Sequence, residues 1–133
     1  AIFIGNGSGI AGLLAHLKQR IDDVQYQNWL IYGERQSTFD HVFSEDLETW
    51  QRLGQITTIN RVFSRDKSSE KYVQDVLRKH ANEFKHWVEQ GACIYLCGSL
   101  NMAQGIDDAL VEILGAKQIN ALRKAGHYRR DVY

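Results

Sequence analysis

The chain opens on an apolar run that gives way to closely spaced glycines and then to a pattern of helical period. Residues 1–4 read AIFI, residues 5–9 read GNGSG, and apolar side chains follow at positions 10, 13, 14 and 17. The apolar run predicts a buried strand, and the later spacing predicts a helix that continues over residues 11–20. A strand, a glycine turn and a helix in this order allow backbone N–H groups to approach a phosphate or a flat cofactor ring.

Strand-like and helix-like segments continue to alternate along the rest of the chain. β-branched and other apolar residues predict strands over 28–33, 55–63 and 92–97 and a terminal strand that reaches residue 133. Helical spacing predicts helices over 42–53 and 72–90, a helix that runs to residue 114, and a short helix over 118–125. Gly54, Gly91 and Gly115 are expected to end the first three of these helices. The pattern predicts an α/β fold, a doubly wound and mainly parallel five-stranded sheet with helices on both faces.

The loops after the strands of such a sheet meet at one edge, where ligands of this fold class bind. These loops contain residues 5–7, 33–35, 64–65 and 97–98. We therefore expect them to line one crevice. Strand 92–97 is apolar throughout and is expected to be covered on both faces.

Composition excludes several classes of function. Basic and acidic residues number 16 each among 133 residues, so no basic field for nucleic acid is present. No apolar run approaches the roughly 18–20 residues of a membrane span. Because Ala1 lies inside the first apolar run, we expect residues 1–133 to be one domain cut from a longer protein.

The two cysteines, Cys93 and Cys97, fall in one predicted strand. At ~3.3 Å per residue they stand about 13 Å apart, which is too far for a disulfide. We expect two free thiols and a reducing, cytoplasmic compartment. None of the five histidines has a cysteine or carboxylate at metal-ligand spacing, so no metal is expected.

The glycine turn also satisfies the G-x-G-x-x-G pattern through Gly7, Gly9 and Gly12. Between a strand and a helix this pattern indicates dinucleotide binding. In an ordinary Rossmann domain Glu34, at the end of the second strand, would bind the adenosine ribose. The alternatives are a glycine turn that merely joins strand and helix, and a solvated Glu34.

A second group of candidates follows the third strand. Ser64 and Arg65, with Lys67 and Lys71 nearby, offer a hydroxyl and positive charges that suit a phosphate monoester. Tyr72 could stack on an adenine ring. A solvated charge cluster is the competing interpretation. Cys97, taken alone, is read more simply as an inert buried thiol and Tyr133 as a frayed chain end.

Taken together, these segments resemble the pyridine-nucleotide domain of the ferredoxin–NADP reductase superfamily, in particular its diflavin-reductase branch. The resemblance covers residues 2–133. Its motifs occur in the family's order: GNGSGIA at 5–11, YGER at 32–35, FSRD at 63–66, YVQ at 72–74, IYLCG at 94–98, NMA at 101–103 and YRRDVY at 128–133.

The resemblance implies a set of NADPH contacts. Ser64 and Arg65 would hold the 2′-phosphate, and Tyr72 and Gln74 would contact the adenine. The glycine loop would face the pyrophosphate and the nicotinamide ribose, with Ser8 in the place of the family's Thr. The residues assigned to the cofactor are Gly5, Asn6, Gly7, Ser8, Gly9, Gly33, Arg35, Ser64, Arg65, Lys71, Tyr72, Gln74, Gly98, Asn101 and Met102.

The resemblance also implies where the chemistry occurs, at Cys97, Asp131, Tyr133 and Ser8. Cys97 would lie beside the reacting carbon of the nicotinamide, and Asp131 would orient that cysteine or stabilise charge as hydride moves. Tyr133 would stack on the flavin ring of FAD and swing aside for the nicotinamide.

The chain departs from the family pattern at several positions. Gly12 stands where the family has Pro, and Ser99 replaces an Asp. The family's basic residue two positions before the tyrosine is Glu70 here, and the nearest lysine, Lys71, lies one position later. The family's flavin-binding motif is absent from these residues. We therefore expect an NADPH-binding module whose FAD lies on a preceding domain of the same chain and whose electrons pass to FMN, to a flavodoxin-like domain or to another acceptor. A regulatory nucleotide-binding domain without turnover and an NAD-type dehydrogenase domain are the alternatives.

Overall fold

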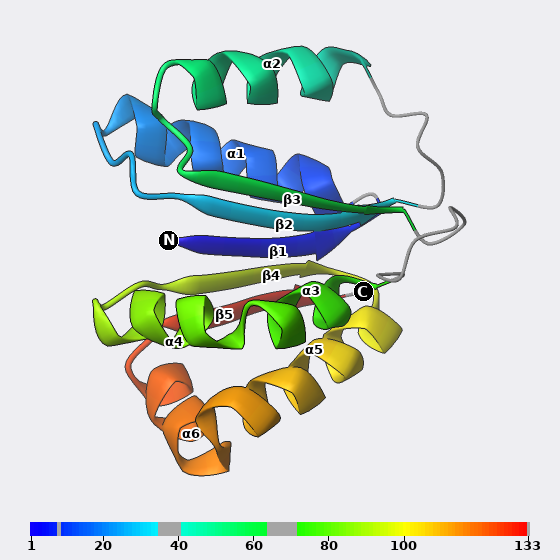
Figure 1. Ribbon diagram of the computed structural model, residues 1–133, viewed down its shortest axis with the longest axis vertical. Coiled ribbons are helices and arrows are strands. Elements are labelled where there is room, and N and C mark those ends of the chain that lie inside the picture. The colour runs from blue at the N-terminus through cyan, green and yellow to red at the C-terminus, as the bar shows by residue number, and fades with distance from the viewer. Residues whose placement is uncertain (8, 35–40, 64–71, 133) are drawn as a thin grey trace.

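The computed structural model describes residues 1–7, 9–34, 41–63 and 72–132. Its elements follow the predicted alternation of strands and helices (Figure 1). In chain order they are β1 (Ile2–Asn6), α1 (Gly9–Asp22), β2 (Trp29–Glu34), α2 (His41–Arg52), β3 (Thr58–Phe63), α3 (Val73–Lys79), α4 (Ala81–Glu89), β4 (Ile94–Gly98), α5 (Leu100–Leu114), α6 (Ala116–Lys124) and β5 (Tyr128–Val132).

The strands form one five-stranded sheet in the order β3-β2-β1-β4-β5. Each neighbouring pair is parallel. The predicted fold class, doubly wound α/β with helices on both faces, is confirmed. The chain runs outward from β1 in both directions, so the switch point of the topology lies between β1 and β4, where this fold class places its ligand crevice.

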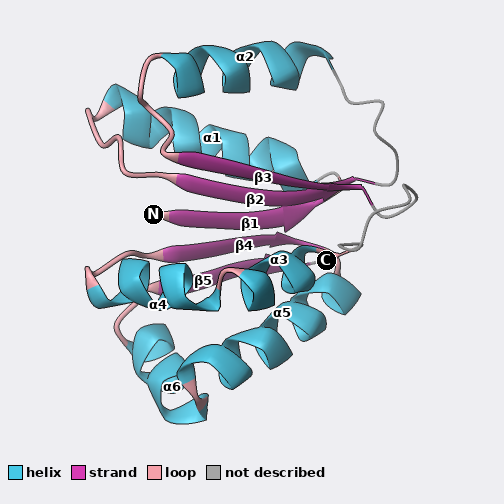
Figure 2. Ribbon diagram, viewed as in Figure 1, coloured by secondary structure: helices cyan, strands magenta, loops and turns pink. Residues whose placement is uncertain are grey.

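Helices cover the two faces of the sheet unequally (Figure 2). On one face, α3, α4, α5 and α6 bury a core that includes Ile4, Phe84 and Leu110. On the other face, α1 and α2 bury a second core around Phe3 and Leu17. The first face is closed over β5, whose Tyr128 belongs to that core, whereas α1 packs on β1 and β4.

The predicted single helix over 72–90 is wrong, because the structure has two helices separated at His80. His80 has φ −105° and ψ 31° and lies edge-on to the Trp29 ring at 6.3 Å. Apolar spacing could not show the break, because α3 and α4 bury side chains in the same core on either side of it. Smaller differences are that β3 begins at residue 58 rather than 55 and that α6 begins at residue 116 rather than 118.

The amino edge of the sheet is closed by hydrogen bonds between loops. The fully buried Asn28 side chain donates to the carbonyls of Gln25 and Gln55 at 2.8 and 2.9 Å. Its amide oxygen accepts from Arg20 Nε at 2.7 Å. One side chain thus holds together the loops that follow α1 and α2.

Helices α1 and α2 end in the same way with different residues. After α2, Gly54 N–H donates to the Gln51 carbonyl and Gln55 N–H to the Trp50 carbonyl, with Gly54 at φ 73°. These are the bonds of a Schellman motif, in which glycine is favoured. After α1, Val24 occupies the equivalent position at φ 60° and is 70% exposed. The expected C-terminal glycine is confirmed for α2, and α1 carries a β-branched residue in its place.

Candidate functional site

The register of the sheet brings distant candidate residues together at its carboxyl edge. Gly5 of β1 lies beside Cys97 of β4, and Cys97 lies beside Asp131 of β5. On the other side of β1, Asn6 lies beside Gly33. The strand ends expected to share one edge of the sheet are therefore neighbours there for these residues.

The glycine turn after β1 provides clearance for two different reasons. At Gly5 an added Cβ would collide with the Leu13 side chain and lie 2.7 Å from the Cys97 carbonyl oxygen, so glycine lets α1 close onto the sheet. At Gly7 the φ angle is 52°, and within the described part of the chain no atom lies within 4 Å of an added Cβ. Helix α1 begins at Gly9 and has no acidic residue in its first turn. A helix N-terminus whose first turn carries no carboxylate suits an anionic group.

Asn6 connects the turn after β1 to the turn after β4. Its Oδ1 accepts a hydrogen bond from Ser99 N–H at 3.2 Å. Gly98 adopts φ 156°, and an added Cβ there would collide with Asn6 Oδ1 and approach Met102 Cε to 2.8 Å. Ser99, the departure from the family's Asp, caps α5 by accepting from Met102 N–H at 3.3 Å. These contacts hold the backbone of the turn after β1 against the backbone of the turn after β4.

Cys97 is buried at the end of β4 against the first turn of α1. An added Cβ at Gly12 would lie 3.2 Å from Cys97 Sγ, so Gly12 allows the helix to pack against the thiol. Burial, and secondarily the negative charge of Asp131, raises the pKa of the Cys97 thiol. The sulfur is therefore a neutral thiol near neutral pH rather than a nucleophilic thiolate. Both cysteines are free, as predicted.

Asp131 is held in place through the edge strand that carries it. Tyr128 OH donates to Asp107 Oδ1 of α5 at 2.5 Å, and Arg130 Nη2 lies 3.4 Å from Asp107 Oδ2. Arg123 of α6 reaches the same carboxylate at 3.3 Å. Burial and the bond to Asp107 raise the pKa of Tyr128, so its hydroxyl keeps its proton. We call this group the Asp107 cluster; it ties β5 to α5 behind Asp131.

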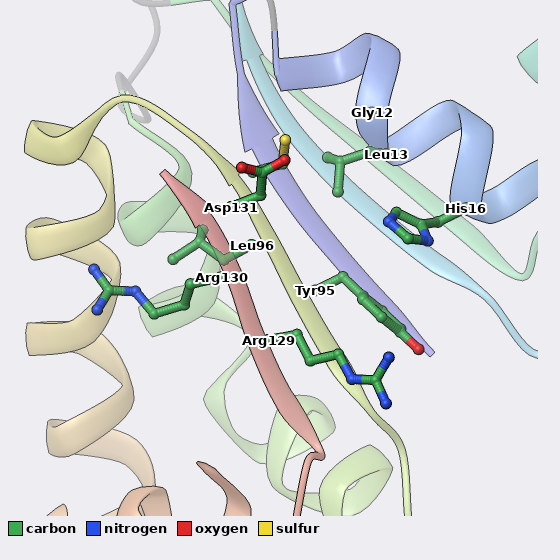
Figure 3. A pocket seen from close by; sticks show the side chains of 9 residues that line it. Gly12, Leu13, His16, Tyr95, Leu96, Arg129, Arg130 and Asp131 are labelled. Carbon is green, nitrogen blue, oxygen red and sulfur yellow. The ribbon is translucent and has the colours of Figure 1, made fainter. Parts of the chain in front are cut away.

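A groove of about 220 Å³ runs between α1 and β5. It lies on the face of β5 opposite to the Asp107 cluster. In Figure 3, Arg129 and Asp131 point into this groove, whereas Arg130 points away from it toward α5. Cys97 and Asp131 line one end, and His16, Tyr95 and Arg129 line the rest. We call this cavity the β5 groove. The sequence analysis did not single out His16, Tyr95 and Arg129. Strand β4 is covered on both faces as expected, and Tyr95 is its half-buried residue.

The adenine-side candidates lie apart from this groove. Tyr72 is 56% exposed and precedes α3, where its backbone N–H donates to Asp75 Oδ2 at 3.1 Å. The Gln74 amide packs against α5 at Gly105. A Cβ atom added at Gly105 would lie only 2.8 Å from Gln74 Nε2. Asn101 is exposed on the first turn of α5, and Met102 is buried against Gly98. The Tyr72 ring is exposed, whereas Gln74 faces a neighbouring helix.

Several candidates lie outside the described residues: Ser8, Arg35, Ser64, Arg65, Lys71 and Tyr133. Their assignments stay predictions from the resemblance. Within the described ranges, no group of three or more His, Cys, Asp or Glu side chains is arranged to hold a metal ion. Among the helices of the same ranges, none has the length and apolar character needed to cross a membrane.

Comparisons with known proteins agree with this arrangement. Residues 3–108 match the family model for the oxidoreductase NAD-binding domain. The chain is 36% identical, over 99% of its length, to the sulfite reductase [NADPH] flavoprotein alpha-component of Yersinia pestis bv. Antiqua (strain Antiqua), of which it covers 24%. It is 35% identical, over 99% of its length, to the protein of that name from Salmonella arizonae, again covering 24%.

The doubly wound parallel sheet together with the matched family model defines a nucleotide-binding domain of an oxidoreductase. The chain belongs to the oxidoreductase NAD-binding domain family, and its resemblance to the diflavin-reductase branch of the ferredoxin–NADP reductase superfamily is confirmed. It spans about a quarter of the length of the curated relatives it matches.

Proposed function

We propose that this chain binds NADPH and positions its nicotinamide for hydride transfer to FAD on another domain of the same polypeptide. The electrons would then pass to FMN or another acceptor. The observation that carries the proposal is the register that places Cys97 and Asp131 side by side, next to Gly5, at the carboxyl edge of the sheet.

The described residues fit a dinucleotide. The backbone conformation at Gly7 and the N-terminus of α1 suit the pyrophosphate. The exposed Tyr72 offers an aromatic face for the adenine. Preference for NADPH over NADH rests on Ser64 and Arg65, which the resemblance assigns to the 2′-phosphate.

Bound NADPH supplies a hydride, which the flavin accepts. The chain's own part is to bind, orient and balance charge. Cys97, a neutral thiol, offers a small polarizable surface beside the reacting carbon without a second negative charge. Asp131 is exposed at the same end of the β5 groove, where its carboxylate offsets the positive charge that develops as hydride leaves.

Cofactor preference tests the proposal against a dehydrogenase that uses Glu34. Arg65→Ala in the full-length protein should weaken NADPH binding by roughly ten- to a hundredfold, because a hydrogen bond to a charged group contributes about 1.5–3 kcal/mol. NADH binding should change little. Titration of both nucleotides by calorimetry measures this. Equal losses for NADPH and NADH, or no loss for either, would contradict the assignment of Arg65.

Hydride transfer itself separates the proposal from a regulatory domain. Rapid mixing of the full-length protein with NADPH should bleach the flavin absorbance within the turnover time. A protein that binds NADPH tightly and leaves its flavin oxidised would be a regulatory domain instead.

A further inference from the structure

Strand β5 carries Asp131 but has little apolar content with which to fix its own position. It lies at the edge of the sheet, where β4 is its one neighbour among the described strands. Within β5, Tyr128 is buried and Val132 half-buried, whereas the three residues between them are exposed. Such a strand specifies its register only weakly, because a shifted pairing exposes little additional apolar surface. Another interaction is therefore needed to hold Asp131 beside Cys97.

One carboxylate of α5 contacts two alternate residues of β5. Asp107 Oδ1 accepts from Tyr128 OH at 2.5 Å, and Asp107 Oδ2 lies 3.4 Å from Arg130 Nη2. Residues 128 and 130 share one face of the strand, and Figure 3 shows Arg130 pointing away from the β5 groove toward α5. A pairing shifted by one residue would turn both side chains to the other face. A shift of two would bring Val132 or Gly126, neither of which has a side-chain donor, into one of these places.

Arg123 of α6 supports the same arrangement. Its Nη2 lies 3.3 Å from Asp107 Oδ1, and its guanidinium lies 5.3 Å from the centre of the Tyr128 ring. The Asp107 side chain is 25% exposed, so solvent screens its ion pairs less than those of a surface carboxylate. The Asp107 cluster therefore has donors for both carboxylate oxygens in the observed register of β5.

We propose that Asp107 is a positioning residue for hydride transfer, which fixes the register of β5 and thereby places Asp131 beside Cys97. This inference rests on the proposed function, because the place of Asp131 matters to the reaction only if hydride leaves NADPH at this edge. In the observed register Cys97 pairs with Asp131. A pairing shifted by two residues would put the cationic Arg129 there instead, where it would oppose the positive charge that develops as hydride leaves.

An engineered disulfide reports on the register without NADPH or flavin turnover. In Asp131→Cys the new thiol stands beside Cys97 on neighbouring strands and on the same face, as a bridge between adjacent strands requires. The full-length protein with this change is oxidised with glutathione disulfide. Mass spectrometry then quantifies the peptide that joins positions 97 and 131, so links that involve Cys93 are counted separately.

Asp107→Asn is added to this reporter, with Asp108→Asn as the matched control at the next, exposed residue of α5. An amide has one acceptor oxygen, so Asn cannot accept from Tyr128 and Arg130 through separate oxygens. Linking should slow roughly fivefold with Asp107→Asn, because the bridge tolerates little displacement of the two Cα atoms. It should be unchanged with Asp108→Asn. Tyr128→Phe, which keeps the buried ring and removes only the hydroxyl, should slow linking in the same way. Equal rates in all these variants would overturn the proposal.

Rapid mixing with NADPH separates positioning from general damage. In the full-length protein, Asp107→Asn should lower the rate of flavin reduction roughly tenfold and leave NADPH affinity nearly unchanged, because a displaced group costs rate rather than binding. In an Asp131→Asn background the same change should cause no further loss, since a residue that acts through Asp131 has nothing left to position.

An unchanged rate in Asp107→Asn, or losses that multiply in the double variant, would overturn the positioning role. A wild-type protein that leaves its flavin oxidised would refute the proposed function and, with it, the role of Asp107 in hydride transfer. The disulfide rates would still decide whether Asp107 sets the register of β5, so the two failures are distinguishable.

Discussion

The two edges of the sheet are built on opposite principles. At the amino edge, polar groups satisfy one another: Asn28 bonds to Gln25, Gln55 and Arg20 and is fully buried. At the carboxyl edge, backbone positions are fixed at Gly98 and Asn6, while the Asp131 carboxylate stays exposed. The amino edge therefore stabilises the fold, and the carboxyl edge holds groups ready for a ligand.

This division predicts that substitutions at one edge change stability and substitutions at the other change binding. The same strands supply both edges. A variant near the amino end of a strand should therefore change stability, and a variant near the carboxyl end of the same strand should change nucleotide binding.

The largest effect on stability is expected at Asn28. Asn28→Ala removes the hydrogen-bond partners of two carbonyls and a guanidinium, and should lower the free energy of unfolding by about 3 kcal/mol. Urea unfolding followed by circular dichroism measures this. The matched control is Asn101→Ala at the carboxyl edge, which should change stability by less than about 0.5 kcal/mol. Similar losses of stability in both variants would contradict the assignment of stability to the amino edge.

A smaller loss is expected at Gly98, with a second consequence. Gly98→Ala forces a side chain into φ 156° and against Asn6 and Met102. It should cost about 2 kcal/mol, within the range for strained backbone positions. Because the Asn6–Ser99 bond must also shift, NADPH affinity should fall too. Normal NADPH binding by Gly98→Ala would show that this backbone does not form the nucleotide site.

How much of this could be predicted from the sequence differs between the edges. The glycine turn, the ends of α2 and α5, and the neighbourhood of Cys97 and Asp131 follow from local patterns and motif order. The β5 groove does not, because Tyr95 and Arg129 are neighbours only through the pairing of β4 with β5. The break at His80 also escaped prediction, since the apolar period continues through it.

The departures from the family pattern acquire reasons only in three dimensions. Gly12, in the place of Pro, gives Cys97 room to pack against α1. Ser99, in the place of Asp, caps α5. The contact between Gly12 and Cys97 joins two elements that are distant along the chain, so the sequence could not show it, whereas the Ser99 cap is local to the start of α5.

A gain in stability is expected at Val24. Val24→Gly relieves a β-branched residue from the left-handed region, and should raise the free energy of unfolding by about 1 kcal/mol. The reciprocal variant, Gly54→Val, should lower it by about the same amount, since both residues end helices in the same way and no atom crowds Gly54. Urea unfolding of the pair checks this. Neither variant should alter NADPH affinity, and a change in affinity would contradict the separation of the two edges.

The smallest expected effect is the pH dependence contributed by Cys97. Because the folded state raises the thiol pKa above its ordinary value of 9.0, its contribution to stability is complete below that value and is lost as the pH rises above it. The rate of Cys97 alkylation should therefore rise at a higher pH than that of a free cysteine. Asp131→Asn should move this rise toward lower pH. A profile that Asp131→Asn leaves unchanged would show that the Asp131 charge does not reach the thiol.

We propose that hydride leaves NADPH at the carboxyl edge of the sheet, around Cys97 and Asp131. The most direct measurement is the stopped-flow rate of flavin reduction by NADPH in the full-length protein, compared between wild type and Asp131→Asn, with NADPH affinity and melting temperature measured alongside. Asp131→Asn should lower this rate roughly ten- to a hundredfold, because the carboxylate no longer offsets the developing charge, and should leave NADPH affinity and melting temperature nearly unchanged. An unchanged rate of flavin reduction would contradict it.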